Sequence, residues 1–243
     1  MRKPPDTVIC LAGGPGRRLG PLSMPKALVD VQGHSLIDFS IHEFELASIR
    51  RLVLHIGPWT TEFAQKLEEL KVRLGNFGCA LSVEHCEGPE QTLLEALQQC
   101  LLEVQGDIIY WDGDVIVPPG TLRNFTNSIA VSDNDAAVIC SPALLAPSHL
   151  QVTCKNGRAV TPSSTLSMGP FCGIGAYLLR QTVCQLILNN TSLSDIDEVI
   201  SQWVREQNSL GVHKIGQEWA VIHTPNDLET ARSAQWIRQF FQR

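Results

Sequence analysis

A loop rich in glycine and arginine follows the first predicted strand of the chain. It reads Leu11-Ala-Gly-Gly-Pro-Gly-Arg-Arg-Leu19 and leads to Lys26. Closely spaced glycines let backbone N–H groups approach an anion, and arginine side chains supply forked donors for phosphate oxygens. The loop is not a P-loop, because no Gly-Lys-Ser/Thr ends it, and Leu19 stands where a dinucleotide-binding loop needs its third glycine. We interpret it as a cradle for a triphosphate; a tight turn with solvated arginines is the alternative.

Two carboxylates follow a second apolar stretch, Asp107-Ile-Ile-Tyr-Trp-Asp112-Gly113-Asp114. Residues two apart on an extended chain face the same side. Mg²⁺ takes one or two carboxylates together with water and substrate phosphate, so this pair suits it. The alternative is that the aspartates only cap a turn around Gly113.

Short β-branched runs alternate with helical patterns through the first part of the chain, which predicts βαβ units. Strands are expected at Thr7–Leu11, 51–56, 80–84, 107–111 and 136–140, and helices near 36–48, 63–74 and 93–101. We therefore predict an α/β fold with a Rossmann-like, mostly parallel sheet flanked by helices. The glycine loop and the two aspartates then lie at the same carboxyl edge of that sheet.

The second half of the chain no longer alternates strand and helix regularly. Asn156-Gly157 predicts a β-hairpin over residues 151–160, an extension of the parallel sheet. A strand at 173–179, helices at 181–189 and 195–207, and a strand at 211–215 follow. The last helix is expected to begin after Thr224, with Pro225 at its first position and Asp227 in its first turn. No linker-like stretch interrupts the chain, so residues 1–243 are predicted to form a single domain.

Composition excludes several classes of protein. The net charge is −6 over 243 residues and aromatic residues make up 6%, which argues against a nucleic-acid partner. No run approaches the ~18 apolar residues of a membrane span, and the N-terminus lacks a signal-peptide pattern, so we expect no membrane partner and a cytoplasmic location.

The eight cysteines show no CxxC pair and are expected to be reduced and mostly buried. The seven histidines show no zinc-ligand spacing, so core or surface roles are expected for them.

Residues 11–37 resemble the signature of the nucleotidyltransferases that make nucleoside-diphosphate sugars and related activated alcohols. Beyond the glycine loop, Pro21-Leu22, Pro25-Lys26 and Val31-Gln-Gly-His-Ser-Leu-Ile37 follow that signature. The resemblance implies a Mg²⁺-dependent reaction in which a small phosphorylated acceptor, such as a sugar 1-phosphate, attacks the α-phosphorus of a nucleoside triphosphate and releases pyrophosphate. It also implies a role for each matching residue: Arg18, Lys26 and Asp114 in catalysis, Asp114 and Asp112 on the metal, and Leu11, Ala12, Gly13, Gly14, Gly16, Arg17, Thr92, Asp112 and Gly113 on the nucleotide.

The resemblance is less complete toward the C-terminus. Gly173 and Glu198 lie in stretches similar to those that contact the acceptor in the family. The family's acceptor-binding lysine is absent from its usual Glu-Lys-Pro segment here, and Lys155 or Arg158 is the candidate to replace it. Val221 replaces the aspartate that often supplies a second metal ligand in a Trp-x-Asp-Ile-x-Thr-Pro segment. A valine does not coordinate metal, so two interpretations remain: an active nucleotidyltransferase, or a nucleotide- or sugar-nucleotide-binding module of the same fold with weakened or lost activity.

Overall fold

The computed structural model describes residues 3–22, 24–76, 82–87, 92–129, 134–142, 150–155, 158–160, 171–190, 192–206 and 208–242. Within these ranges, nine strands form one sheet: β1 (Thr7–Leu11), β4 (Arg51–Gly57), β5 (Ser82–Glu87), β6 (Ile108–Asp112), β8 (Ala136–Pro142), β9 (Gln151–Lys155), β10 (Arg158–Val160), β11 (Phe171–Leu179) and β12 (Leu210–Lys214). Two short pairs lie beside it: β2 (Asp30–Val31) with β3 (His34–Ser35), and β7 (Val115–Ile116) with β13 (Ala220–Val221). The helices are α1 (Leu36–Leu46), α2 (Thr60–Asn76), α3 (Leu93–Leu102), α4 (Thr121–Ile129), α5 (Gln181–Leu188), α6 (Ile196–Arg205), α7 (Pro225–Ser233) and α8 (Gln235–Arg238), with single turns η1 (Arg17–Leu19), η2 (Lys26–Leu28) and η3 (Phe240–Gln242).

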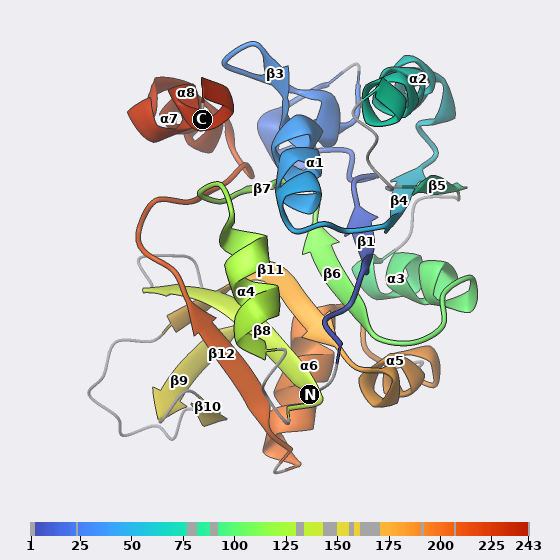
Figure 1. Cartoon of the computed structure of the whole chain (residues 1–243), viewed down its shortest axis with the longest axis vertical. Coiled ribbons are helices and arrows are strands. Elements are labelled where there is room, and N and C mark those ends of the chain that lie inside the picture. Colours follow the sequence, from blue (N-terminus) through green and yellow to red (C-terminus); the bar gives the residue numbers. More distant parts are fainter. Residues whose placement is uncertain are drawn as a thin grey trace.

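The sheet has the order β5-β4-β1-β6-β11-β8-β12-β10-β9 (Figure 1). Strands β5, β4, β1 and β6 are parallel to one another, and β8 is parallel to β12. Strand β11 runs antiparallel between β6 and β8, and β9 and β10 form an antiparallel hairpin at the far edge. The predicted mostly parallel sheet and its hairpin extension are therefore confirmed.

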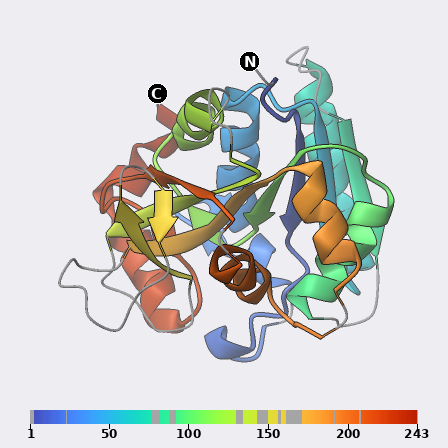
Figure 2. The same ribbon diagram turned by 90° about the horizontal axis from the view of Figure 1, so that it is seen from below.

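Helices cover both faces of the sheet (Figures 1 and 2). On β1, Val8 and Cys10 belong to one apolar cluster, whereas Ile9 and Leu11 belong to another, as the alternation of a strand requires. Helices α1, α2 and α4 bury their apolar side chains in the first cluster, and α3, α5 and α6 in the second. This two-faced burial explains the continuous apolar runs of the parallel strands.

A buried carboxylate joins α1 to α4. Glu43 is 1% exposed and accepts hydrogen bonds from the backbone N–H of Gly120 at 2.6 Å and of Leu122 at 2.9 Å. These donors lie at the start of α4, where N–H groups have no partner within the helix. Burial raises the pKa of Glu43 to about 7, although the two hydrogen bonds oppose that shift.

The C-terminal helices pack against the β2–β3 arm. Gln32 and Gly33 connect the two strands with φ of 58° and 87°, the signs of a type I′ turn. The side-chain Nε2 of Gln32 lies 2.9–3.0 Å from the carbonyl oxygens of Ala231, Arg232 and Ala234, at the end of α7. One side chain of the arm therefore holds the C-terminal end of a helix that is almost 200 residues later in the chain.

Several predicted bounds change in the structure. The strand expected at 80–84 is β5, which begins at Ser82, and residue 80 lies outside the described ranges. The strand expected at 173–179 begins earlier, at Phe171, because its first residues pair with both β8 and β9. Thr224 caps α7 with Pro225 at its first position, as predicted.

Of the cysteines that the structure describes, six are free and all of these except Cys86 are buried. None of the helices in the described ranges is long and apolar enough to cross a bilayer.

Candidate active site

A cavity of about 320 Å³ opens at the carboxyl ends of β1, β4 and β6. The register places Leu11, the last residue of β1, beside Asp112, the last residue of β6. Two of the predicted groups, the glycine loop and the aspartates, therefore meet at one edge of the sheet, where parallel α/β folds bind ligands. The sequence-predicted residues that line the cavity are Leu11, Ala12, Gly13, Gly14, Arg18, Lys26, Thr92, Asp112, Gly113 and Asp114.

The glycine loop turns back on itself, so that its beginning and end lie together. The backbone N–H of Lys26 donates to the carbonyl of Gly14 at 3.2 Å, and the indole N–H of Trp59 donates to the carbonyl of Gly13 at 3.2 Å. Gly16 has a φ of 65°, and a Cβ there would lie 2.8 Å from the side chain of Leu22. Only glycine fits that position without strain, which explains the loop's third glycine although Gly16 does not line the cavity.

Asp112 is enclosed by neighbouring strands. Its Oδ1 accepts a hydrogen bond from the Tyr110 hydroxyl at 2.5 Å. Its Oδ2 lies so close to Gly175 of β11 that a Cβ there would be 2.0 Å from it, and Gly175 has a φ of 75°. Burial, followed by the nearby charge of Asp114, raises the pKa of Asp112 well above its usual range despite the Tyr110 hydrogen bond.

Asp114 behaves differently because two nitrogen groups face it. The Lys26 ammonium donates to its Oδ2, and Nε2 of His223 lies 3.4 Å from the same oxygen. Burial alone would raise the pKa of Asp114, but Lys26 and His223 outweigh it and hold the pKa below its usual range. Asp114 is therefore the carboxylate that stays ionised, and the two aspartates are distinguished by their surroundings.

Two helix starts complete the opposite wall. Thr92 caps α3 by accepting from the N–H of Glu95, and Asp195 caps α6 by accepting from the N–H of Asp197. Asp197 accepts from the Tyr177 hydroxyl and, at 2.9 Å, from the backbone N–H of Leu150. Burial raises the pKa of Asp197 to about 6.

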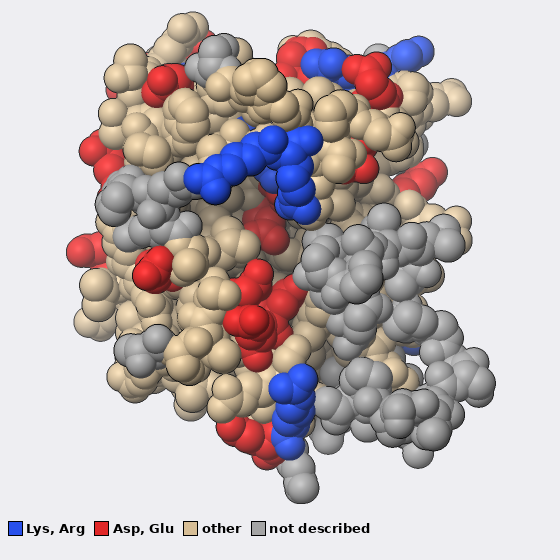
Figure 3. Space-filling model, turned by 180° about the vertical axis from the view of Figure 1, so that it is seen from behind, with Lys and Arg blue, Asp and Glu red and all other residues tan. Residues whose placement is uncertain are grey.

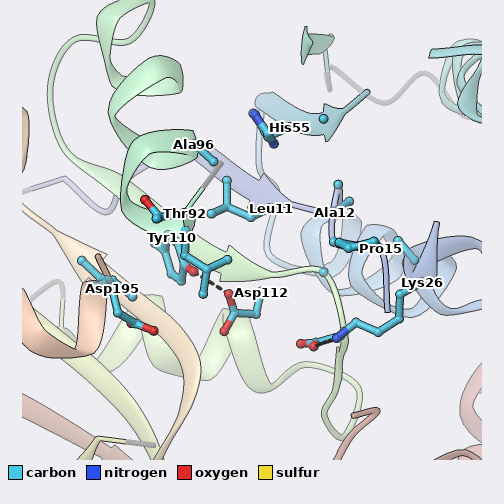
Figure 4. Close-up of a pocket in the computed structure, with 18 of the residues that line it drawn as sticks. Leu11, Ala12, Pro15, Lys26, His55, Thr92, Ala96, Tyr110, Asp112 and Asp195 are labelled. Atoms are coloured by element: carbon cyan, nitrogen blue, oxygen red, sulfur yellow. Dashed lines mark hydrogen bonds and ion pairs between the residues drawn. The ribbon is translucent and has the colours of Figure 1, made fainter. Parts of the chain in front are cut away.

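The cavity consequently has a basic and an acidic side. In Figure 4, Asp112 lies between Lys26 on one side and Asp195 on the other. Figure 3 shows Lys and Arg side chains at one border of a hollow and Asp and Glu side chains at the other. Such a division suits a ligand with an anionic part and a part rich in hydrogen-bond donors.

Four sequence-predicted residues are not among those that line the cavity: Gly16, Arg17, Gly173 and Glu198. Gly173 is packed inside the sheet, where a Cβ would lie 3.2 Å from the Tyr177 hydroxyl oxygen. Glu198 is exposed and accepts from the N–H of Ser194 at 3.0 Å, at the start of α6. The side chains of Lys155 and Arg158 lie outside the described part of the structure.

Val221 does not line the cavity either. It pairs with Val115 across the β13–β7 ladder and packs against the apolar cluster under α1. His223, two residues later, is the side chain that this segment places beside Asp114. The sequence predicts core or surface roles for the histidines rather than zinc binding. His55 and His223 line the cavity, a placement that no spacing motif in the sequence marks.

Further cavity residues were missed for similar reasons. Pro15, Ala27, Gly57, Pro58, Leu93, Ala96 and Ile196 shape the walls, and His55, Tyr110, Asp195 and Asp197 contribute polar groups. Asp195 and Asp197 carried one available signal, because they lie at the start of a helix whose N-terminus is at the cavity. The sequence-based prediction assigned the contact with the acceptor to Glu198 instead.

A divalent cation fits Asp114 better than it fits Asp112. Both oxygens of Asp112 are enclosed, Oδ1 by the Tyr110 hydroxyl and Oδ2 by Gly175, whereas Oδ2 of Asp114 faces the nitrogen groups of Lys26 and His223. Among the described side chains, no three from His, Cys, Asp and Glu are grouped so as to hold a metal ion by themselves. A cation at Asp114 would need further ligands from water or substrate phosphate.

The parallel sheet, the glycine loop and the carboxylates at its edge define an α/β nucleotidyltransferase. The family model described as the MobA-like NTP transferase domain matches residues 8–162, more than half of the chain. The chain belongs to this family.

Solved structures show the same fold. The inositol-1-phosphate CTP transferase from T. maritima has a TM-score of 0.73 at 18% identity, over 96% of this chain and 99% of that one. A protein assigned as a glucose-1-phosphate thymidylyltransferase from Bacillus anthracis, solved in complex with sucrose, has a TM-score of 0.75 at 17% identity, over 96% and 98%. No curated protein matches the chain.

Proposed function

We propose that this protein is a metal-dependent nucleotidyltransferase that joins a nucleoside triphosphate to a sugar 1-phosphate or another small phosphorylated acceptor and releases pyrophosphate. The observation that carries this proposal is the convergence of Gly13, Gly14, Arg18 and Lys26 with Asp114 in one cavity. We also propose that it acts in the cytoplasm, on the sequence grounds given above.

The chain's own residues would act mainly by position and charge. Backbone N–H groups of the glycine loop would hold the triphosphate, with Arg18 and Lys26 compensating the negative charge that spreads over the phosphates during transfer. Mg²⁺ at Asp114 would supply further charge neutralisation of the phosphates. The acceptor phosphate would attack the α-phosphorus from the side opposite pyrophosphate, so orientation of the two substrates contributes much of the rate.

The acidic side of the cavity favours an acceptor rich in hydroxyl groups. The carboxylates of Asp195 and Asp197 offer acceptor oxygens for such groups. The structural neighbours are described as acting on inositol 1-phosphate and glucose 1-phosphate, both phosphorylated polyols. These names support a phosphorylated polyol or sugar for this chain too.

The test is a pyrophosphate-release assay with the four common nucleoside triphosphates and a panel of sugar 1-phosphates and alcohol phosphates. We expect release with at least one pair of substrates and loss of it in the Asp114→Asn variant. The exposed acid Asp30→Asn provides a matched control outside the cavity. A folded protein that releases no pyrophosphate with any pair and any of Mg²⁺, Mn²⁺ or Co²⁺ would refute the proposal.

The second candidate function is a nucleotide- or sugar-nucleotide-binding module with weakened or lost activity. It is favoured by Val221, which brings an apolar side chain to the position expected to hold a metal ligand. Thermal unfolding with each triphosphate separates the two candidates. Binding raises the melting temperature in both, but the module would show little metal dependence and no pyrophosphate release.

A further inference from the structure

We infer that His223 replaces the missing carboxylate as the second protein ligand of the catalytic cation, and that the site therefore prefers a transition-metal dication such as Mn²⁺ to Mg²⁺. This inference rests on the proposed function only for the use of the metal in the reaction. Binding of the metal depends on Asp114 and His223 and not on whether the protein catalyses the reaction.

The two donor atoms lie close together at the edge of the cavity. Nε2 of His223 lies 3.4 Å from Oδ2 of Asp114, and both residues line the cavity. Two neighbouring ligands of an octahedral ion with bonds of about 2.1 Å lie about 3 Å apart. The imidazole nitrogen and the carboxylate oxygen are thus already spaced almost as neighbouring ligands of one ion.

Backbone hydrogen bonds hold the segment around His223 in place. On one side, the N–H of Ile222 donates to the carbonyl of Asp114 at 3.1 Å. On the other, the N–H groups of His223 and Thr224 donate to Oδ2 of Asp227 at 3.0 and 2.7 Å, within the cap of α7. These hydrogen bonds fix the position of the His223 backbone relative to Asp114 before any metal binds.

The donor atoms at this site are a nitrogen and an oxygen rather than two oxygens. Val221 cannot supply an oxygen, and its side chain packs into the apolar cluster instead. Mg²⁺ is bound almost wholly by oxygen, whereas affinity of mixed nitrogen and oxygen sites rises from Mn²⁺ through Co²⁺ to Ni²⁺. Exchanging a carboxylate for an imidazole therefore moves the preference of the site away from Mg²⁺.

Lys26 is the one group that competes for the same oxygen of Asp114 among the described side chains. A dication at this oxygen would repel the ammonium, and a phosphate bound at the glycine loop would compensate the charge of both. We therefore expect the metal to bind more tightly when an oligophosphate is present, and the test includes inorganic tripolyphosphate as a probe.

The experiment is pulsed electron paramagnetic resonance of Mn²⁺ bound to the full chain, with and without tripolyphosphate. A directly bound imidazole gives a ¹⁴N coupling to the manganese spin. We expect this coupling in the wild type and in the control His85→Asn, whose imidazole is exposed outside the cavity. We expect it to be absent in His223→Asn, while Asp114→Asn should lose most of the bound manganese.

A second measurement determines metal preference. Titration of Mg²⁺ against bound Mn²⁺ should show that His223→Asp lowers the preference for Mn²⁺ by at least about tenfold. Unchanged ¹⁴N coupling in His223→Asn, an unchanged preference in His223→Asp, or no Mn²⁺ binding under either condition would each overturn the inference. If the inference fails but pyrophosphate is released with Mg²⁺, the proposed function stands. A ¹⁴N coupling without any turnover would support the metal site and refute the activity.

Discussion

The ammonium of Lys26 and the carboxylate of Asp114 form an ion pair across the floor of the cavity, between residues 88 positions apart in the chain. Each side chain is only 14% exposed. The pair joins the glycine loop to the turn after β6, and it places a positive group where phosphates would bind. Removing either partner leaves the other charge partly buried without its main compensation.

Lys26→Met should lower kcat by about 100-fold or more, because it removes a cation that is expected to stabilise charge in the transition state. Steady-state kinetics of pyrophosphate release measure the effect. Lys71→Met, on the exposed side of α2, should retain wild-type activity. A Lys26→Met variant that is folded and fully active would contradict the assigned role. Charge reversal at Asp114 is a poorer test, since a lysine there would face the ammonium of Lys26.

Gly175→Ala should destabilise the protein by about 2 kcal/mol or more, since its φ of 75° disfavours a side chain and its Cβ would collide with Asp112. Denaturant unfolding measures the change. Gly216→Ala is the matched control, because a Cβ there meets nothing within 4 Å and its φ is not positive. Equal stability of the two variants would show that β11 does not constrain Asp112.

Glu43 makes stability depend on pH. Its folded-state pKa, about 7, is raised above the ordinary value of 4.5, so the native state holds the proton more tightly than the unfolded chain. The associated stability is complete below pH 4.5 and is lost as the pH rises through about 7, a change of about 3 kcal/mol. Unfolding free energies of the wild type and Glu43→Gln, measured from pH 4 to 8, should therefore differ in slope over this window. The exposed Glu62→Gln should keep the wild-type slope.

Asp197→Asn should weaken use of the acceptor more than use of the triphosphate. Hydrogen bonds to a charged group contribute about 1.5–3 kcal/mol, so kcat/KM for the acceptor should fall by about 10- to 100-fold. The KM for the triphosphate should change little, since Asp197 lies on the side away from the glycine loop. Exposed Glu229→Gln is the control. A loss at Glu198→Gln but not at Asp197→Asn would favour the sequence-based assignment over the geometry.

The elements near the glycine loop could be predicted because each rests on local signals. Apolar strands, helical spacing and the Thr224-Pro225 cap each depend on residues that are close together in the sequence. The strand predictions place the glycine loop and Asp112 at the same edge of the sheet, as the structure has them. Helix α4 was not predicted, although Leu122 and Phe125 lie on its buried face at helical spacing. The reversal of β11 could not be deduced either, since strand direction depends on which neighbours it meets.

The cavity was predicted only in part, because some of its residues come together through contacts between distant parts of the chain. Residues 11–26 and 112–114 carry a recognisable spacing, but His223 and Asp197 enter through long-range packing. His223 reaches Asp114 because β13 pairs with β7, and Asp197 reaches the cavity because the start of α6 lies beside Leu150. Contacts of this kind have no periodicity in the sequence.

The contact of Gln32 with the end of α7 has a consequence for the order of folding. The wall that carries His223 is held by α7, and α7 is held by a side chain from the beginning of the chain. During synthesis, the glycine loop and strands β1, β4 and β6 are made long before residues 225–234. Closure of such a distant contact comes late and slows folding. The nascent protein therefore contains the glycine loop and Asp114 well before α7 can hold His223 beside that carboxylate.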